Sequence, residues 1–194
     1  ADTRRKILDR FVGRSTVRIE MPENMAFQLM AQAMKETSDP VLLPEWQEDK
    51  ADLNAELTGV RSTIISSAKK TATMGDKTII KDAELQAIVP IHPYAALLLK
   101  HMSVAFNSNA RSMFDFIISN DMTDAKAFKW YINNYGPLDE KNLLTIDMLW
   151  DFFTGADHSG LNDDVRVILD SYNLLKKDSL TPDQERIFKT VLLL

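Results

Sequence analysis

The sequence predicts a mainly α-helical protein, an irregular bundle of about 7–9 helices with at most one small two-stranded ribbon. The first observation behind this prediction is that apolar residues recur at three- and four-residue spacing in one segment after another. The second is the low content of helix-breaking residues, 6 Gly and 7 Pro among 194 residues. The third is a set of helix-start signals, of which the clearest is the capping box TPDQ at residues 181–184.

The N-terminal part predicts two helices around a short extended segment. A helix is expected over Thr3–Val12, ending at Gly13. Val17–Met21 alternates apolar and charged residues, and this period of two predicts a short strand that Pro22 closes. A second helix is expected over Glu23–Lys35. Its inward face should comprise Phe27, Met30 and Met34.

The longest predicted helix is Glu45–Thr71, which follows a loop over Ser38–Pro44. An apolar seam typical of two-helix packing runs along it, formed by Trp46, Leu53, Leu57, Val60 and Ile64. Gly59 lies inside this helix and weakens it. Acidic residues gather in its N-terminal half, where the helix dipole stabilises them. We interpret these residues as a solvated face rather than a metal site.

A loop and a short helix are predicted next. The loop contains GDKT at residues 75–78, which is not a phosphate-binding loop. Such a loop needs an earlier glycine, a lysine directly after the second glycine and a preceding strand. Ile79-Ile80 is expected to be extended and to pair with Val17–Met21. Asp82 is expected to cap a helix that runs through Ile88.

The stretch from Ile88 to Ile118 predicts an extended entry, a helix, a polar break and a second helix. Pro93 starts the first helix, because its fixed φ and missing N–H suit the first turn. The apolar face of that helix should comprise Leu98, Met102 and Ala105, flanked by Leu97, His101 and Val104. Residues 107–109 break the pattern and offer N-caps. Ala110, Phe114 and Ile117 restart it, flanked by Met113 and Ile118.

The remaining helices carry clear end signals. Thr123 is expected to cap a helix to Tyr135, which Gly136 and Pro137 terminate. Thr145 is expected to cap a helix over Ile146–Thr154. Asn162–Lys177 reads as an amphipathic helix with acidic residues at its start and lysines at its end, as the helix dipole favours. A last helix follows the capping box at residues 181–184.

Composition and charge argue against several classes of function. The formal net charge of −5 argues against binding nucleic acid or an acidic membrane over the whole surface. The chain has no cysteine, which removes disulfides and zinc–thiolate sites and suits a cytoplasmic protein. No apolar run approaches the ~20 residues of a membrane span, so we expect no membrane partner.

The chain is expected to form one helical unit over residues 1–194, with possible sub-units over residues 1–120 and 121–194. It opens directly into a helical pattern after Thr3 and ends on the apolar run Val191–Leu194. We therefore expect a fragment of a larger protein. The alternative is a processed N-terminus together with a C-terminal helix docked on its own core.

The sequence contains no recognisable catalytic constellation. Its histidines, His92, His101 and His158, are scattered, and no H-E-x-x-H is present to support a zinc site. No G-x-S-x-G and no legible Ser/His/Asp set occur either. We therefore predict no catalytic residue, no metal site and no enzymatic activity for this chain alone.

One residue departs from the local rules for helices. Arg111 places a cation in the first turn of a predicted helix, where the dipole favours anions, and such departures can mark function. In a structural interpretation Arg111 pairs with Asp115 or packs on the preceding helix. In a functional interpretation it points at a nucleotide bound by another part of a larger protein. Its planar, permanently charged guanidinium suits phosphate.

His92-Pro93, a Leu-rich helix and the run Ser108–Ile117 together resemble a segment of large bacterial P-loop ATPases from phage-defence islands, including BREX-type systems. In that family the segment reads roughly L-H-P, a helix, then Q-N-E-R-S-L-F-x-F-L, and it follows the nucleotide-binding core. The resemblance covers Pro90–Ile118, and Glu185–Leu194 is similar to a later helix of the same proteins. Within the segment, Ser108 stands for Gln and residue 110 is Ala where the family has Glu.

The resemblance implies a non-catalytic, lid-like helical region that completes or senses a nucleotide site made elsewhere in a parent ATPase. Arg111, His92 and Asn109 are then the candidates for sensing nucleotide. The parent would bind ATP and Mg, while this chain would hold no cofactor. Its partners would be the remainder of the parent and other protein subunits, with nucleic acid handled only through the parent.

Other interpretations stay open beside this one. His92 has a structural interpretation, in which its imidazole satisfies a backbone group at a helix start. The whole chain has an alternative function as a structural helical module that binds a partner protein through its apolar seam, with no nucleotide role. A DNA-binding winged-helix unit is disfavoured, because Asn162–Lys177 is too acidic for a recognition helix.

Overall fold

The computed structural model describes residues 26–34, 36–72, 80–105, 113–119, 126–135, 142–154, 163–176 and 180–194. In these ranges the chain forms ten helices and no strand, so the predicted mainly helical bundle is confirmed. The helices are α2 (Ala26–Ala33), α3 (Leu42–Glu56), α4 (Thr58–Ala72), α5 (Asp82–Ala87), α6 (Pro93–Ala105), α7 (Met113–Ile118), α8 (Phe128–Tyr135), α10 (Ile146–Thr154), α11 (Asp163–Lys176) and α12 (Pro182–Leu193). The helix predicted over Thr3–Val12 and the strand over Val17–Met21 lie outside the described residues.

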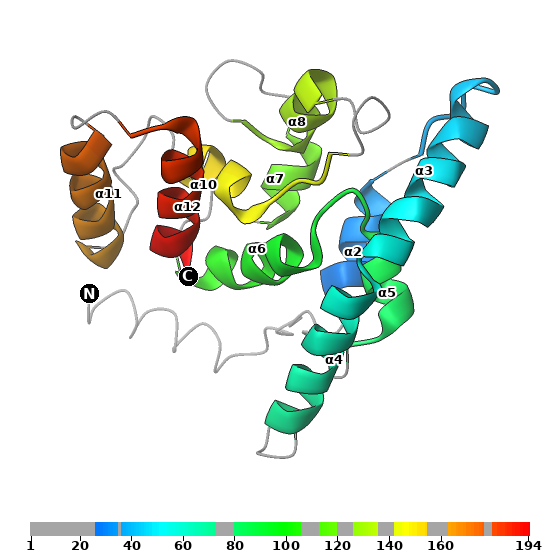
Figure 1. The fold of residues 1–194 in the computed structure, drawn as a ribbon, viewed down its shortest axis with the longest axis horizontal. Helices are drawn as coiled ribbons and strands as arrows, with labels where there is room; N and C mark the ends of the chain where they lie inside the picture. The colour runs from blue at the N-terminus through cyan, green and yellow to red at the C-terminus, as the bar shows by residue number, and fades with distance from the viewer. Residues whose placement is uncertain are drawn as a thin grey trace, which may run out of the picture.

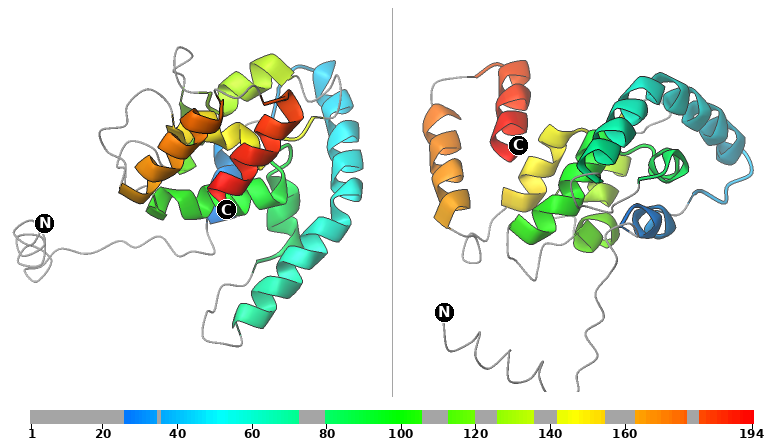
Figure 2. Two further views of the ribbon diagram at one scale, coloured as in Figure 1. Left: turned by 60° about the vertical axis from the view of Figure 1, so that its left-hand side comes forward. Right: turned by 90° about the horizontal axis from the view of Figure 1, so that it is seen from below.

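The helices pack around one large hydrophobic core. α6 runs through the middle of the molecule, α3 and α4 follow one another along one side, and α11 and α12 lie on the opposite side (Figures 1 and 2). The core draws fully buried side chains from helices far apart in the sequence, including Met30, Leu85, Leu99, Phe116 and Phe153. Within the described ranges, no helix has the length and apolar character needed to cross a bilayer.

Two short non-helical segments pair in the middle of the fold. Ile91 and Leu144, both fully buried, form an isolated parallel bridge. The His92 N–H donates to the Leu144 carbonyl (2.9 Å), and the Leu144 N–H donates to the Pro90 carbonyl (2.9 Å). These bonds hold the start of α6 beside the start of α10. The other pairing, predicted between Ile79-Ile80 and Val17–Met21, involves residues outside the described ranges.

The prediction of one long helix over Glu45–Thr71 is wrong, because two helices, α3 and α4, meet at Leu57 (φ −81°, ψ 1°). The first begins earlier than predicted, since the Asp39 carboxylate accepts the N–H groups of Val41 (2.8 Å) and Leu42 (3.3 Å). The break does not come from Gly59, which lies inside α4 with open space beside it. The apolar seam still faces inward, with Leu53, Leu57 and Ile64 buried and Trp46 and Val60 packed beside them.

The predicted cap of α5 is also wrong. The N-cap residue is Lys81, and its N–H donates to the carboxylate of Glu84 (3.1 Å). Asp82 is the first residue inside the helix, and its carboxylate accepts hydrogen bonds from Arg61 and Gln86 instead. The Asp82 side chain therefore binds Arg61 of α4 instead of capping α5 as local sequence rules predicted.

The inward face of α6 differs from the prediction. Pro93 starts the helix as expected, but among residues 94–101 the fully buried side chains are Ala95, Ala96 and Leu99. Leu97 and Leu98 are only partly buried, and His101 is exposed. The small side chains of Ala95 and Ala96 let neighbouring helices approach α6 closely. The prediction placed larger apolar residues on the inward face instead. The side chains of the other predicted face residues, Met102, Val104 and Ala105, lie outside the described set.

Other boundaries agree more closely. α10 has the predicted bounds, α11 begins and ends within one residue of the prediction where it is described, and α12 begins at Pro182, as its capping box predicts. The capping box of α12 is present: the Gln184 N–H donates to Thr181 Oγ1 (3.3 Å) and the Thr181 N–H donates to Gln184 Oε1 (2.9 Å). α8 begins at Phe128 rather than just after Thr123, a residue outside the described ranges.

Candidate functional site

His92 lies at the N-terminus of α6, where its imidazole accepts a backbone hydrogen bond. The Tyr94 N–H donates to His92 Nδ1 (3.3 Å), and the two rings stack with centroids 5.8 Å apart. Burial lowers the pKa of His92 below its ordinary value of 6.5, so the ring is neutral at pH 7. Because Nδ1 accepts, the proton of the neutral ring is on Nε2, which is a donor. The contact is the one that the structural interpretation of His92 predicts.

The two other sequence candidates cannot be placed beside it. Arg111 and Asn109 lie outside the described residues, so their surroundings are not described.

An apolar groove opens beside His92, between the N-termini of α6 and α10 and the outer face of α12. Its volume is about 610 Å³. It is lined mainly by His92, Tyr94, Ile146, Ile187, Thr190 and Val191. Ile187 and Val191 point outward on α12 and are 65% and 61% exposed. The groove thus presents apolar surface to solvent beside the N-terminus of α6.

A second cavity, the charged cleft, lies between α8, α10 and α12 and has a volume of about 490 Å³. Its lining carries three cations and three carboxylates, namely Lys126, Arg186, Lys189, Asp147, Asp151 and Glu185. Two aromatic residues, Trp130 and Tyr135, form part of its wall and contact each other edge-on at 5.7 Å. Charged and aromatic groups together give this cleft the more varied chemistry of the two cavities.

Asp151 lies at the centre of the charges in this cleft. Its Oδ2 accepts a hydrogen bond from Lys126, and its Oδ1 accepts one from Lys189 (3.1 Å). Burial raises the pKa of Asp151, but the hydrogen bonds from Lys126 and Lys189 outweigh burial and hold the pKa below its ordinary value. Asp151 is therefore a carboxylate at neutral pH, bound by one cation on each oxygen.

Lys189 connects this carboxylate to a second one. Its Nζ lies 3.2 Å from Glu185 Oε1, one helical turn earlier on α12, and Glu185 also accepts a hydrogen bond from the Tyr172 hydroxyl. Burial lowers the pKa of Lys189, but its bonds to Asp151 and Glu185 more than reverse this and raise it. Burial and Glu185 together raise the pKa of Tyr172, so its hydroxyl stays a donor.

A further ion pair stands between the charged cleft and the apolar groove. Arg186 Nε donates to Asp147 Oδ2 (3.0 Å), while Thr145 Oγ1 donates to Asp147 Oδ1. All three residues line both cavities. The two cavities are therefore neighbours that share one wall.

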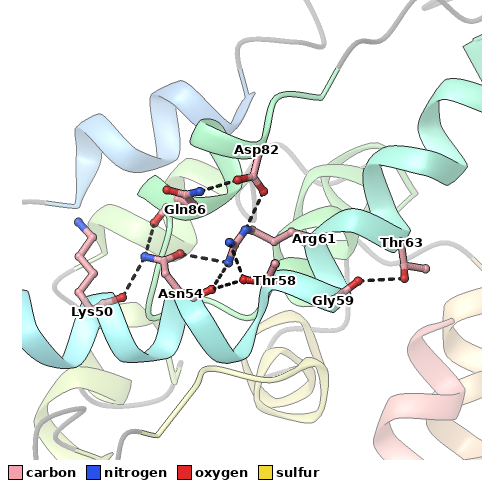
Figure 3. Close-up of polar contacts among 8 residues, drawn as sticks. All are labelled: Lys50, Asn54, Thr58, Gly59, Arg61, Thr63, Asp82 and Gln86. Atoms are coloured by element: carbon pink, nitrogen blue, oxygen red, sulfur yellow. Dashed lines mark hydrogen bonds and ion pairs between the residues drawn. The ribbon is translucent and has the colours of Figure 1, made fainter.

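Arg61 forms a separate cluster where α3, α4 and α5 meet (Figure 3). Its side chain is only 4% exposed. Its Nε donates to Asp82 Oδ1 of α5 (2.8 Å), and its Nη1 donates to the Asn54 carbonyl of α3 (2.6 Å). The bond from Arg61 holds the pKa of Asp82 below its ordinary value. One arginine on α4 thus joins three helices at the break near Leu57.

Sequence reasoning missed the charged cleft and the Arg61 cluster. A weak signal existed, because Asp147 and Asp151 recur at i, i+4 in an otherwise apolar helix, and Glu185 and Lys189 recur at the same spacing. That spacing places each pair on one helix face but does not say that the two faces meet. Among the described residues, no group of three or more acidic or histidine side chains could hold a metal ion.

Comparisons with known proteins add no assignment. No family model, no curated protein and no solved structure matches this chain.

Proposed function

We propose that this chain is a non-catalytic helical region of a larger bacterial P-loop ATPase of phage defence, and that it completes or senses a nucleotide site made elsewhere in that protein. The observation that carries the proposal is the resemblance of the segment Pro90–Ile118 to such ATPases. That segment supplies α6 and α7, whose buried residues include Leu99 and Phe116 of the central core. A segment so placed transmits any displacement at its ends to several packed helices.

His92 supports this proposal through the nitrogen that it does not use for capping. Because Nδ1 accepts the Tyr94 N–H, a neutral His92 offers Nε2–H as a donor at the rim of the apolar groove. A neutral donor binds a phosphate or ribose oxygen by hydrogen bonding rather than by charge. In the proposed function, Arg111 supplies the charge, and Asn109 and His92 supply neutral hydrogen bonds.

The test is a steady-state ATPase assay on the full-length protein that contains this chain. Arg111→Ala should lower turnover while leaving the melting temperature unchanged, and Arg111→Lys should restore it only in part, because an ammonium lacks bidentate geometry. The chain alone should show no measurable hydrolysis, since phosphate binding needs a cradle of N–H groups or a lysine loop. Unchanged turnover in Arg111→Ala would overturn the sensing role. A large fall in melting temperature would do so as well.

A second candidate function is a helical module that binds a partner protein. The apolar groove favours it, whereas the predicted apolar seam does not, because Leu53, Leu57 and Ile64 are buried in the chain's own core. Exposed apolar residues one turn apart on a helix, such as Ile187 and Val191, are typical of surfaces that bind another protein. If this function is correct and the first is wrong, Ile187→Ser and Val191→Ser should change the assembly of the full-length protein in size-exclusion chromatography with light scattering. Arg111→Ala should then leave both assembly and turnover unchanged.

A further inference from the structure

The Lys126 side chain lies in the charged cleft, between an aromatic ring and a carboxylate. Lys126 Nζ lies 5.0 Å from the centre of the Trp130 ring and also donates to Asp151 Oδ2. An aromatic face and a carboxylate that converge on one ammonium group are what sites for cationic side chains provide. The contacts of Lys126 therefore describe the chemistry of a ligand that this part of the cleft accepts.

Lys126 is the replaceable cation of the three. It is 46% exposed and lies in the non-helical link before α8. Lys189, by contrast, is 14% exposed, belongs to α12 and contacts both Asp151 and Glu185. Arg186 is paired with Asp147 at the far wall. If Lys126 leaves, Lys189 still holds Oδ1 of Asp151 and keeps the carboxylate in place.

The balance of charge in the cleft indicates what can take the place of Lys126. With Lys126 inside, the three cations match the three carboxylates. Without it, one negative charge remains uncompensated beside the Trp130 ring. A ligand that restores the balance carries one positive charge, and a planar guanidinium both stacks on an indole and bonds a carboxylate.

We propose that the charged cleft binds an arginine or lysine side chain from a basic segment of a partner protein, and that Lys126 occupies the site when the partner is absent. The inference does not depend on the ATPase proposal, because Lys126, Trp130 and Asp151 lie outside both segments that resemble the ATPases. It assigns Trp130 and Asp151 as the groups that contact the ligand. Lys126 is assigned as an internal competitor for the same position.

The test titrates the full chain with N-acetyl-arginine methylamide and follows the indole N–H signal of Trp130 by NMR. The chain has 3 Trp, and loss of one signal in Trp130→Phe assigns the signal of interest. Lys126→Ala should bind the probe about three- to tenfold more tightly than the unmodified chain, because a competing ion pair and cation–π contact are gone. Lys69→Ala, which removes an exposed cation of α4, should bind like the unmodified chain. The citrulline analogue, which has the same shape without charge, should not bind.

Two further variants test the groups that receive the ligand. In the Lys126→Ala background, Asp151→Asn should weaken binding at least about tenfold, the scale expected for losing a charge-assisted contact. Trp130→Leu, followed by the chemical shifts of neighbouring backbone amides on α8, should weaken it severalfold. Equal affinity of the chain and Lys126→Ala would overturn the proposal, and so would unchanged binding after Asp151→Asn. If Asp151→Asn unfolds the chain, the Trp130→Leu result decides.

Discussion

Two clusters of charged residues in this protein pair cations with carboxylates, and they differ in how deeply the cation is buried. In the Arg61 cluster a buried guanidinium meets one carboxylate and one helix carbonyl, and it joins α3, α4 and α5. In the charged cleft Asp151 meets two lysines, one deeply placed and one half exposed, beside an open cavity. The first cluster holds helices together, and the second presents charge to solvent.

The contrast teaches how burial decides the role of a salt bridge. In the Arg61 cluster the cation is the buried member, because Arg61 is 4% exposed whereas Asp82 is 48% exposed. Removing Asp82 would leave a buried guanidinium without its carboxylate, so the fold depends on this pair. An exposed pair gains little, and water or another cation replaces either member at small cost. On this argument the Arg61 cluster is a structural joint, while Lys126 in the charged cleft is exchangeable.

The largest expected effect is that of Arg61→Ala. The change removes the hydrogen bonds that join three helices and leaves the Asn54 carbonyl without one of its partners. We expect the free energy of unfolding to fall by about 3 kcal/mol, because hydrogen bonds from a charged group and the packing of a buried side chain are lost together, while Asp82 remains in contact with solvent. Urea unfolding measures it. The control is Lys50→Ala, which breaks the exposed pair with Glu36 and should cost less than about 1 kcal/mol. Similar losses in the two variants would contradict the structural role.

A smaller loss is expected for Asp151→Ala. Lys189 keeps Glu185 as an ion-pair partner, and Lys126 is already half exposed to solvent. No buried cation is therefore left without a carboxylate. The free energy of unfolding should fall by about 1–2 kcal/mol, the scale of a hydrogen bond to a charged group. Urea unfolding of this variant beside Arg61→Ala gives the comparison. A loss larger than that of Arg61→Ala would reverse the ranking of the two clusters.

Neither cluster could be derived from the sequence, and the reason is physical. Arg61 is one residue in a helix with several polar positions, and its burial depends on how α5 packs against α4. The seam of apolar residues in α3 and α4 was predictable because helical spacing is local. The break at Leu57 was not predictable. It lies beside Arg61, whose side chain binds the Asn54 carbonyl of α3 and the Asp82 carboxylate of α5, and these contacts depend on tertiary packing.

α12 and α6 also differ in how much of their structure could be predicted from the sequence. The capping box at residues 181–184 uses only neighbouring groups, so the start of α12 was predictable. α6 carries apolar residues around much of its circumference, so spacing alone could not select Ala95, Ala96 and Leu99 as its buried face. The position of His92 at a helix start was predictable from Pro93, whereas the meeting of Asp151 and Lys189 depends on the packing of α10 on α12.

The capping box offers a third perturbation that should leave both clusters intact. Thr181→Ala removes the hydroxyl that accepts the Gln184 N–H at the start of α12. A lost N-cap typically costs about 1 kcal/mol. Thermal and urea unfolding should show this loss, whereas Thr181→Ser should behave like the unmodified chain. A cost near zero would mean that packing alone holds the first turn of α12.

The smallest expected effect concerns pH. Burial lowers the pKa of His92 in the folded state, so the unfolded chain binds this proton more readily. The contribution of His92 to the free energy of unfolding is therefore fully present above pH 6.5, the ordinary pKa of histidine. It declines as the pH falls through 6.5 toward the lower pKa of the folded state. Urea unfolding between about pH 7.5 and 5 measures the slope. His92→Asn keeps an N-cap acceptor but cannot titrate, so it should remove this component. An identical pH profile in the variant would contradict the assignment.

A pair of double-mutant cycles tests the central contrast most directly. One cycle combines Arg61→Ala with Asp82→Ala, the other combines Lys126→Ala with Asp151→Ala, and urea unfolding gives the coupling free energy of each pair. The account predicts about 2 kcal/mol or more for Arg61 with Asp82, the scale of a partly desolvated charged hydrogen bond. For Lys126 with Asp151 it predicts less than about 1 kcal/mol, as measured for exposed pairs. Equal coupling in the two cycles, or stronger coupling of Lys126 with Asp151, would contradict it.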